Sequence, residues 1–252
     1  MPGLIFLGTA SAVAYPGHEN SHLLFEGESQ TILVDCVGNP VLRLGQVGRE
    51  INEITDLIIT HFHPDHVTGI PLLLMNMWLL GRTERLDIYG LGSALKRVEK
   101  MMGLFGWSAW DMEYAVEFHP LPEENLTLVL ETPEFRIQSS PVNHLIPTIG
   151  LRIEFLEQNR LVAYSGDTEP CPQVVDLAAG ADLLIHEAAG NYSGHTSPGQ
   201  AGEIADQAGV KELFLIHYSF HEKDAAAHLA EAQKTFSGRV ALAEDLTEIN
   251  FE

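Results

Sequence analysis

The pattern of hydrophobic and polar positions begins with short apolar runs separated by glycine and polar residues. This spacing predicts β-strands at residues 4–7, 22–26 and 31–34, with turns between them. Because each strand is followed closely by the next, we expect these strands to form an antiparallel meander.

From residue 40 onward, helical and strand patterns alternate. Helices are predicted at residues 40–47, 67–80, 92–102, 197–208 and 223–236. Strands are predicted at residues 56–60, 86–89, 126–130, 135–139, 149–155, 161–164, 183–185, 213–217 and 240–243. Two β-rich runs, each followed by helices, are typical of two packed sheets with helices on their outer faces. The pattern alone supports a layered α/β or α+β fold, and it predicts one domain over residues 1–252 because no repeat or linker interrupts it.

Composition narrows the class of protein. With 45% hydrophobic residues, the 252-residue chain can bury a sizeable core. The longest apolar stretch, residues 70–80, contains Pro71 and Asn76 and is shorter than the roughly 20 residues of a membrane-spanning helix. No export signal is visible at the start of the chain, so we expect a soluble, cytoplasmic protein with no membrane partner. Cys36 and Cys171 form no CxxC pattern, which indicates neither a disulfide framework nor a cysteine zinc site.

Charge adds a constraint on the substrate. The chain has 35 acidic and 14 basic residues and a formal net charge of −21. This charge repels a polyanion at long range, which counts against a nucleic-acid substrate unless a local basic patch opposes it.

The densest chemical motif is His61-Phe62-His63-Pro64-Asp65-His66, directly after a predicted strand. Imidazole nitrogen and carboxylate oxygen are ligands that zinc accepts, and neutral histidine needs little deprotonation to bind it. In an extended turn His61 and His63 point to the same side, and Asp65 and His66 are placed to begin a second site. The motif therefore predicts a metal centre.

Further ligands must come from other loops, and three candidates directly follow predicted strands: His144, Asp167 and His217. A lone histidine after a strand is more often a packed core residue, and an aspartate after Ser-Gly is more often a turn former. Beside the His-rich motif, however, these strand-end positions favour metal ligands.

Together these residues form ordered blocks. They are Leu33-Val34-Asp35, the HxHxDH motif at 61–66 with its continuation to residue 84, His144, Tyr164-Ser165-Gly166-Asp167-Thr168, His186-Glu187-Ala188, Gly194-His195-Thr196-Ser197 and His217-Tyr218-Ser219. In order and spacing the chain resembles the metallo-β-lactamase superfamily, and within it the ribonuclease Z branch, which processes tRNA 3′ ends.

The resemblance implies a four-layer αββα sandwich and a binuclear site. In it His61, His63 and His144 would bind one zinc ion. The second zinc ion would be bound by Asp65, His66 and His217, with Asp167 bridging the two. Two Zn²⁺ ions are therefore expected, with Mn²⁺ or Fe²⁺ as alternatives in one or both sites. Asp35 would orient a ligating imidazole.

Such a pair of metals would share a hydroxide and lower its pKa towards neutrality, so that water and not a side chain is the nucleophile. The residues expected to be catalytic are Asp65, His195 and Glu187. By the same resemblance His195 would protonate the leaving group, assisted by Glu187. The alternative is that His195 merely precedes a helix that Thr196 or Ser197 caps.

The chain departs from ribonuclease Z where that family carries a long arm that grips tRNA. Here 22 residues separate His144 from Asp167, which leaves room only for a hairpin. Four functions stay open: a phosphodiesterase for a small or short phosphodiester, a carboxylic or sulfuric ester hydrolase or lactonase, a tRNA 3′-processing endoribonuclease, and a non-enzymatic metal-binding protein. Of these the phosphodiesterase is favoured and tRNA is disfavoured. A homodimer is expected from the resemblance, and residues 101–112 could form a lid, an interface or core.

Overall fold

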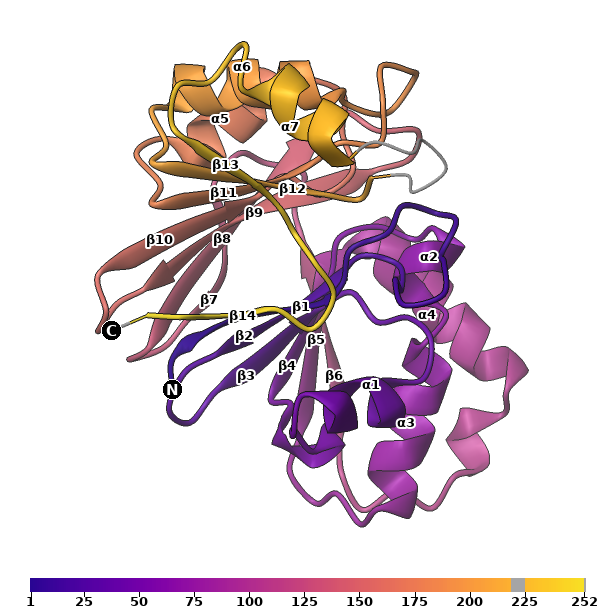
Figure 1. Ribbon diagram of the computed structural model, residues 1–252. Helices are drawn as coiled ribbons and strands as arrows, with labels where there is room; N and C mark the ends of the chain where they lie inside the picture. The colour runs from indigo at the N-terminus through magenta and orange to yellow at the C-terminus, as the bar shows by residue number, and fades with distance from the viewer. Residues whose placement is uncertain (219–224, 252) are drawn as a thin grey trace.

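The computed structural model describes residues 1–218 and 225–251, which fold into four layers (Figure 1). Two seven-stranded sheets pack face to face, and helices cover the outer face of each. The αββα sandwich implied by the resemblance is confirmed. Ser219 and the first residues of the predicted helix at 223–236 lie outside the described residues.

The first sheet combines an antiparallel half with a parallel half. In spatial order its strands are β14 (Glu248–Asn250), β1 (Gly3–Gly8), β2 (His22–Glu26), β3 (Thr31–Val34), β4 (Asp56–Ile59), β5 (Leu86–Leu91) and β6 (Val116–Leu121). β1, β2 and β3 pair antiparallel, which confirms the predicted meander. From β3 to β6 the pairing is parallel, as strands connected through helices require.

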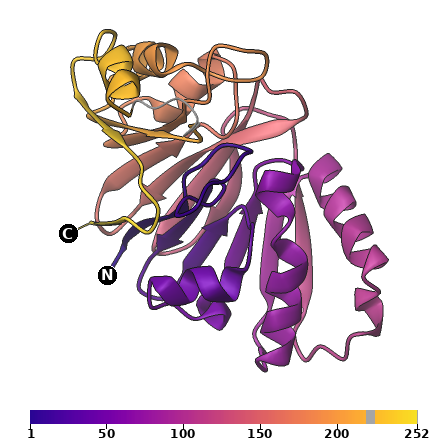
Figure 2. The ribbon, with the colours of Figure 1, turned by 45° about the vertical axis from the view of Figure 1, so that its right-hand side comes forward.

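Helices of the first half cover this sheet. They are α1 (Pro40–Gln46), α2 (Pro64–Val67), α3 (Ile70–Leu79) and α4 (Gly92–Leu104), with 3₁₀ turns η1 (Ile51–Glu53) and η2 (Trp107–Ala109). Figure 2, turned by 45°, keeps α3 and α4 side by side on the outer face of the sheet. In the 101–112 segment, Met101, Trp107, Trp110 and Met112 pack against the core beneath these helices, whereas Phe105 is exposed.

The second sheet has the same plan. Its spatial order is β13 (Arg239–Leu242), β12 (Glu212–Ile216), β11 (Leu183–Glu187), β10 (Arg160–Tyr164), β9 (Thr148–Phe155), β8 (Phe135–Val142) and β7 (Thr127–Glu131). The helices α5 (Pro172–Ala178), α6 (Pro198–Ala208) and α7 (Ala225–Ala232) lie over its outer face (Figure 1).

Alternation along the strands builds three hydrophobic layers. In β3, Ile32 and Val34 face the core between the sheets, whereas Leu33 faces the helices of the first half. Between the sheets, Phe135 and Phe155 meet edge to face with ring centroids 4.8 Å apart. Burying such a side chain stabilises the fold by about 1.5–3 kcal/mol. Strands buried on both faces explain why these segments are nearly continuous apolar runs.

The predicted helix at residues 67–80 is wrong in one respect, because α2 ends at Val67 and α3 begins at Ile70. A Cβ on Gly69 would lie 2.8 Å from the backbone of Val37, so any larger residue at this position would clash with Val37. Pro71 lacks an amide hydrogen and fits the first turn of a new helix.

The sequence prediction lacks β6, α5 and β14, and it also lacks α2 and the 3₁₀ turns η1 and η2. β6 is an edge strand of its sheet and contains Pro120. Edge strands tolerate proline, but a proline in a sequence argues against predicting a strand there. The short strand β14 is defined by its pairing with β1, where Gly3 is opposite Asn250. A contact between residues so far apart in sequence leaves no local pattern.

The segment in place of the tRNA-gripping arm is a hairpin. β9 and β10 pair antiparallel with Phe155 opposite Arg160, so only residues 156–159 form the turn. This confirms that no arm is inserted between His144 and Asp167. Within residues 1–218 and 225–251, every helix is too short or too polar to cross a membrane.

Candidate metal centre

The seven predicted metal ligands converge at the ends of strands from both sheets. His61 lies just beyond β4, His144 follows β8, Asp167 follows β10 and His217 follows β12. Their ligand atoms form two groups, and within each group the atoms lie no more than 4.8 Å from one another. The first group is His61, His63 and His144, and the second is Asp65, His66, Asp167 and His217. These are the two sets that the resemblance implies.

The first group consists of three imidazoles whose nitrogens face one another. Nδ1 of His63 lies 3.0 Å from Nε2 of His61 and 3.1 Å from Nε2 of His144. Burial lowers the pKa of all three side chains, which favours the neutral rings whose lone pairs bind metal. Three converging imidazole nitrogens are typical of a zinc site.

Asp167 lies between the two groups. Its Oδ2 atom is 3.3 Å from Nε2 of His217, 3.4 Å from Nε2 of His66 and 3.9 Å from Nε2 of His61. Nε2 of His144 is 4.0 Å away. One carboxylate oxygen thus faces nitrogens from both groups, which is the position of a bridging ligand.

Several buried polar atoms of the second group have no hydrogen-bond partner within the described part of the chain. They are Nε2 of His66, Oδ1 of Asp167 and both ring nitrogens of His217. An unsatisfied buried polar group costs about 1–3 kcal/mol, so these atoms indicate a bound group. Imidazole nitrogens and carboxylate oxygens fit a divalent cation such as zinc.

The charges of the second group support this assignment. Burial acts to lower the pKa of His66, but the Asp167 and Asp35 carboxylates raise that pKa well above its usual value. Burial acts to raise the pKa of Asp167, but His217 and His66 hold it well below its usual value. Two carboxylates thus surround the His66 ring with negative charge, which a bound cation would balance.

Asp35 and Thr60 orient two of the candidate ligand rings. Oδ2 of Asp35 accepts hydrogen bonds from Nδ1 of His66 at 2.7 Å and from the Thr60 hydroxyl at 2.7 Å. The Thr60 hydroxyl in turn accepts from Nδ1 of His61 at 3.0 Å. With each Nδ1 held in this way, Nε2 is the nitrogen left for a metal in both rings.

Replacing Asp35 with asparagine is expected to weaken metal binding about 10- to 100-fold. The Thr60 amide donates to Oδ1 of Asp35 at 2.8 Å, which fixes the asparagine oxygen at that position. The asparagine NH₂ would then face Nδ1 of His66 and favour a proton on Nε2, the metal-facing nitrogen. Zinc affinity, measured by competition with a chelating dye, checks this.

Asparagine is a suitable replacement because the Asp35 backbone is left-handed, with φ of 59°, a conformation that asparagine also adopts. The variant should therefore fold, as measured by circular dichroism. An unchanged zinc affinity in a folded Asp35→Asn protein would contradict the orienting role.

His195 and Glu187 form a hydrogen-bonded pair beside the centre. Nδ1 of His195 lies 2.9 Å from Oε1 of Glu187. The carboxyl group is fully buried and also accepts from the amides of Thr168 at 3.1 Å and Ala189 at 2.9 Å. Burial and the neighbouring Asp167 raise the pKa of Glu187 to about 8. The imidazole of His195 stacks on that of His217 with centroids 5.5 Å apart.

The helix cap of the alternative interpretation is confirmed. Ser197 caps α6, accepting a hydrogen bond from the amide of Gln200 in a capping box. The Thr196 hydroxyl donates to the Thr168 carbonyl at 2.6 Å, away from the helix end. His195 thus precedes a capped helix and also lies beside the candidate metal ligands, so its role as general acid stays a prediction.

Two hollows lie near the candidate ligands, and Ile146 and Pro147 line both of them. One, of about 370 Å³, is lined by Asn143, His144, Glu169 and Ser193 among others. The other, of about 80 Å³, is lined by Phe62, Ser93, Ala94, Arg97, Ile146 and Pro147. Hollows of this size fit parts of a small molecule.

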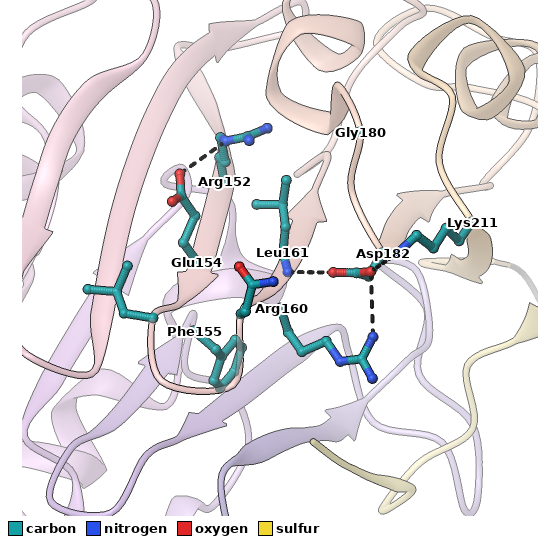
Figure 3. A pocket seen from close by; sticks show the side chains of 10 residues that line it. Arg152, Glu154, Phe155, Arg160, Leu161, Gly180, Asp182 and Lys211 are labelled. Carbon is teal, nitrogen blue, oxygen red and sulfur yellow. Dashed lines mark hydrogen bonds and ion pairs between the residues drawn. The ribbon is translucent and has the colours of Figure 1, made fainter. Parts of the chain in front are cut away.

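A third hollow, of about 350 Å³, lies where strands of the second sheet begin, at the opposite end from the metal ligands (Figure 3). Its cationic side chains are already paired. Asp182 lies 2.5 Å from Nζ of Lys211 and 3.6 Å from the Arg160 guanidinium. Arg152 is 3.4 Å from Glu154. Because each cation has a carboxylate partner, we assign no chemistry to this hollow.

Comparisons with known proteins bear on the family and the fold of the chain. A family model described as Anti-Pycsar protein Apyc1 matches residues 3–240. The chain is 28% identical to a ribonuclease Z of Methanothermobacter thermautotrophicus, over 94% of this chain and 92% of that protein. It is similar in structure to the metallo-β-lactamase fold protein YhfI of Bacillus subtilis, with a TM-score of 0.83, 23% identity and 99% of each chain covered. Human short-form tRNase Z, ELAC1, gives a TM-score of 0.78 at 25% identity over 99% of each chain.

Proposed function

The chain belongs to the family of the anti-Pycsar protein Apyc1, and from that membership we propose that it is a metal-dependent phosphodiesterase acting on a cyclic mononucleotide. The observation that carries the proposal is the His195–Glu187 pair beside the two groups of metal ligands. Phosphodiester hydrolysis needs both an activated water and a proton for the leaving oxygen, and these two parts of the site can supply them.

The roles of the residues follow from their hydrogen bonds. When bound, two divalent cations would activate water and stabilise charge on the phosphoryl oxygens. The imidazoles and Asp65 would hold these cations, and Asp167 would lie between them. When the His195 ring is protonated on both nitrogens, Nδ1 donates to Glu187 and Nε2 holds the proton that can pass to the leaving oxygen. Buried Glu187 keeps the ring in that orientation.

The surroundings support a small substrate over RNA. Most of the basic residues that could have formed a patch make other contacts. The Arg43 guanidinium pairs with Asp245 and that of Arg49 with Glu26, while Arg85 pairs with Asp87. Arg82 donates to three backbone carbonyls. Six basic residues of the first half could form such a patch: Arg43, Arg49, Arg82, Arg85, Lys96 and Arg97. Lys96 and Arg97 are left after these contacts, which is too few to counter a net charge of −21 along an RNA strand.

The proposal is tested with the zinc-loaded protein on a panel of substrates. It consists of a 3′,5′-cyclic mononucleotide, bis(p-nitrophenyl) phosphate, a short RNA, p-nitrophenyl acetate and p-nitrophenyl sulfate, with Asp167→Ala as the blank. We expect kcat/KM for the two small phosphodiesters to exceed that for the acetate and sulfate at least about 100-fold, because the proposed site stabilises charge on a phosphoryl group and protonates its leaving oxygen. The cyclic nucleotide should also be a better substrate than the RNA.

Two outcomes would favour the other functions. Faster hydrolysis of the acetate or sulfate would indicate an esterase, lactonase or sulfatase. Faster cleavage of RNA would favour the second candidate, a tRNA-processing activity, which the 28% identity to a ribonuclease Z supports and the missing arm opposes.

A further inference from the structure

The backbone of His217 is held in an uncommon conformation. Its φ is 55°, in the left-handed region that residues other than glycine seldom adopt. The side chain is buried among the other ligands of the second group. A costly backbone conformation persists only where neighbouring contacts enforce it, so the contacts of this residue decide where its imidazole points.

Thr9 supplies the backbone contact. The amide of His217 donates to the Thr9 carbonyl at 2.8 Å, and the next residue, Tyr218, accepts from the amide of Ser11 at 3.3 Å. Thr9 itself is fully buried and lies just beyond β1 in the other sheet. The end of one sheet thus fixes a metal ligand at the end of the other.

Asp245 holds Thr9 in place. The Thr9 hydroxyl donates to Oδ1 of Asp245 at 2.5 Å, and the amide of Glu19 donates to Oδ2 at 2.7 Å. The guanidinium of Arg43 pairs with the same carboxylate and also donates to the Leu7 carbonyl. The Asp245 side chain is only 5% exposed, so this ion pair is weakly screened.

From these contacts we infer that Thr9, Arg43 and Asp245, which we name the Asp245 network, are positioning residues for His217. None of them offers an atom to the metal groups of the described chain. The network sets the affinity of the metal held by Asp65, His66, Asp167 and His217, and leaves the set of His61, His63 and His144 unaffected. The inference rests on the metal centre of the proposed function. It adds the residues that set the metal affinity of the second group.

The test is a pair of substitutions at Thr9. Thr9→Val keeps the shape of the side chain and removes the hydroxyl bond to Asp245, whereas Thr9→Ser keeps that bond. In Thr9→Val we expect one of two zinc equivalents to bind about 10-fold more weakly, because partners that orient a ligand change metal affinity by that order. Thr9→Ser should bind both as the wild type does. Zinc affinity is measured by competition with a chelating dye, and Tm is recorded in parallel.

A matched control separates positioning from general destabilisation. Thr55 also donates its hydroxyl to an aspartate, Asp56, at 2.6 Å, but it precedes β4 at the end remote from His61. Thr55→Val should lower Tm without changing zinc affinity. The inference is overturned if Thr9→Val binds both equivalents at wild-type affinity, or if Thr55→Val weakens binding equally. Because the readout is zinc affinity, failure to hydrolyse any phosphodiester would count against the proposed function alone.

Discussion

Replacing Asp167 with alanine is expected to remove at least one of two metal equivalents and to lower kcat/KM about 1,000-fold or more. Oδ2 of Asp167 lies within 4.0 Å of Nε2 in His61, His66, His144 and His217. Without this carboxylate, Asp65 would be the one anionic ligand for two divalent cations. Metal content is measured by elemental analysis, and turnover with the best phosphodiester of the panel.

Asp87→Ala is the matched control for this change. Asp87 is likewise a buried aspartate with an imidazole partner, since its Oδ1 lies 2.6 Å from Nε2 of His119. It is located near the start of β5, on the opposite end of the strand from the metal edge. The control should keep both metals. If Asp167→Ala also kept both, the carboxylate would not be the bridging ligand.

Replacing His195 with alanine is expected to keep the metals and lower kcat about 100- to 10,000-fold on a cyclic nucleotide, the range for loss of a general acid. The size of the loss should depend on the leaving group. A ribose alkoxide needs a proton as it departs, whereas p-nitrophenolate is stable without one. The loss on bis(p-nitrophenyl) phosphate should therefore be much smaller, and the ratio of the two losses is the measurement.

His119→Ala serves as control because it removes another imidazole that is paired with a carboxylate, away from the centre. Two results would assign His195 differently. Equal losses on both substrates together with lost zinc would make it a metal ligand, which its position within 4.8 Å of ligand atoms of His144 and Asp167 allows. Unchanged turnover of the cyclic nucleotide in His195→Ala would show that His195 does not take part in the reaction.

Much of the fold could be predicted because its strands are local and apolar. The strands at 22–26 and 31–34 match the predicted bounds, since each is a short hydrophobic run between turn residues. Two of the misses, β14 and the break in the helix predicted at 67–80, share a cause. Whether β14 forms depends on β1, and the break at Gly69 depends on the nearby Val37 backbone. Such tertiary contacts are invisible to periodicity.

The candidate metal ligands were easier to predict than the residues that hold them in position. Imidazoles and carboxylates just after strands are a local signal, and the structure gathers all seven. The link from Thr9 to Asp245 joins residues 236 positions apart, and neither belongs to a motif. A threonine after a strand and an aspartate near a turn are common in any sequence. Only the three-dimensional arrangement shows that they hold His217.

The pairing of β14 with β1 has a consequence for biosynthesis. Gly3, Leu4 and Ile5 pair with residues 248–250, which the ribosome adds after every strand of the second sheet. Throughout translation of the intervening residues, β1 therefore has an open hydrogen-bonding edge that another nascent chain could occupy. The first sheet is therefore completed only after the last strand of the second sheet has been synthesised, and β1 is the strand whose edge stays open longest.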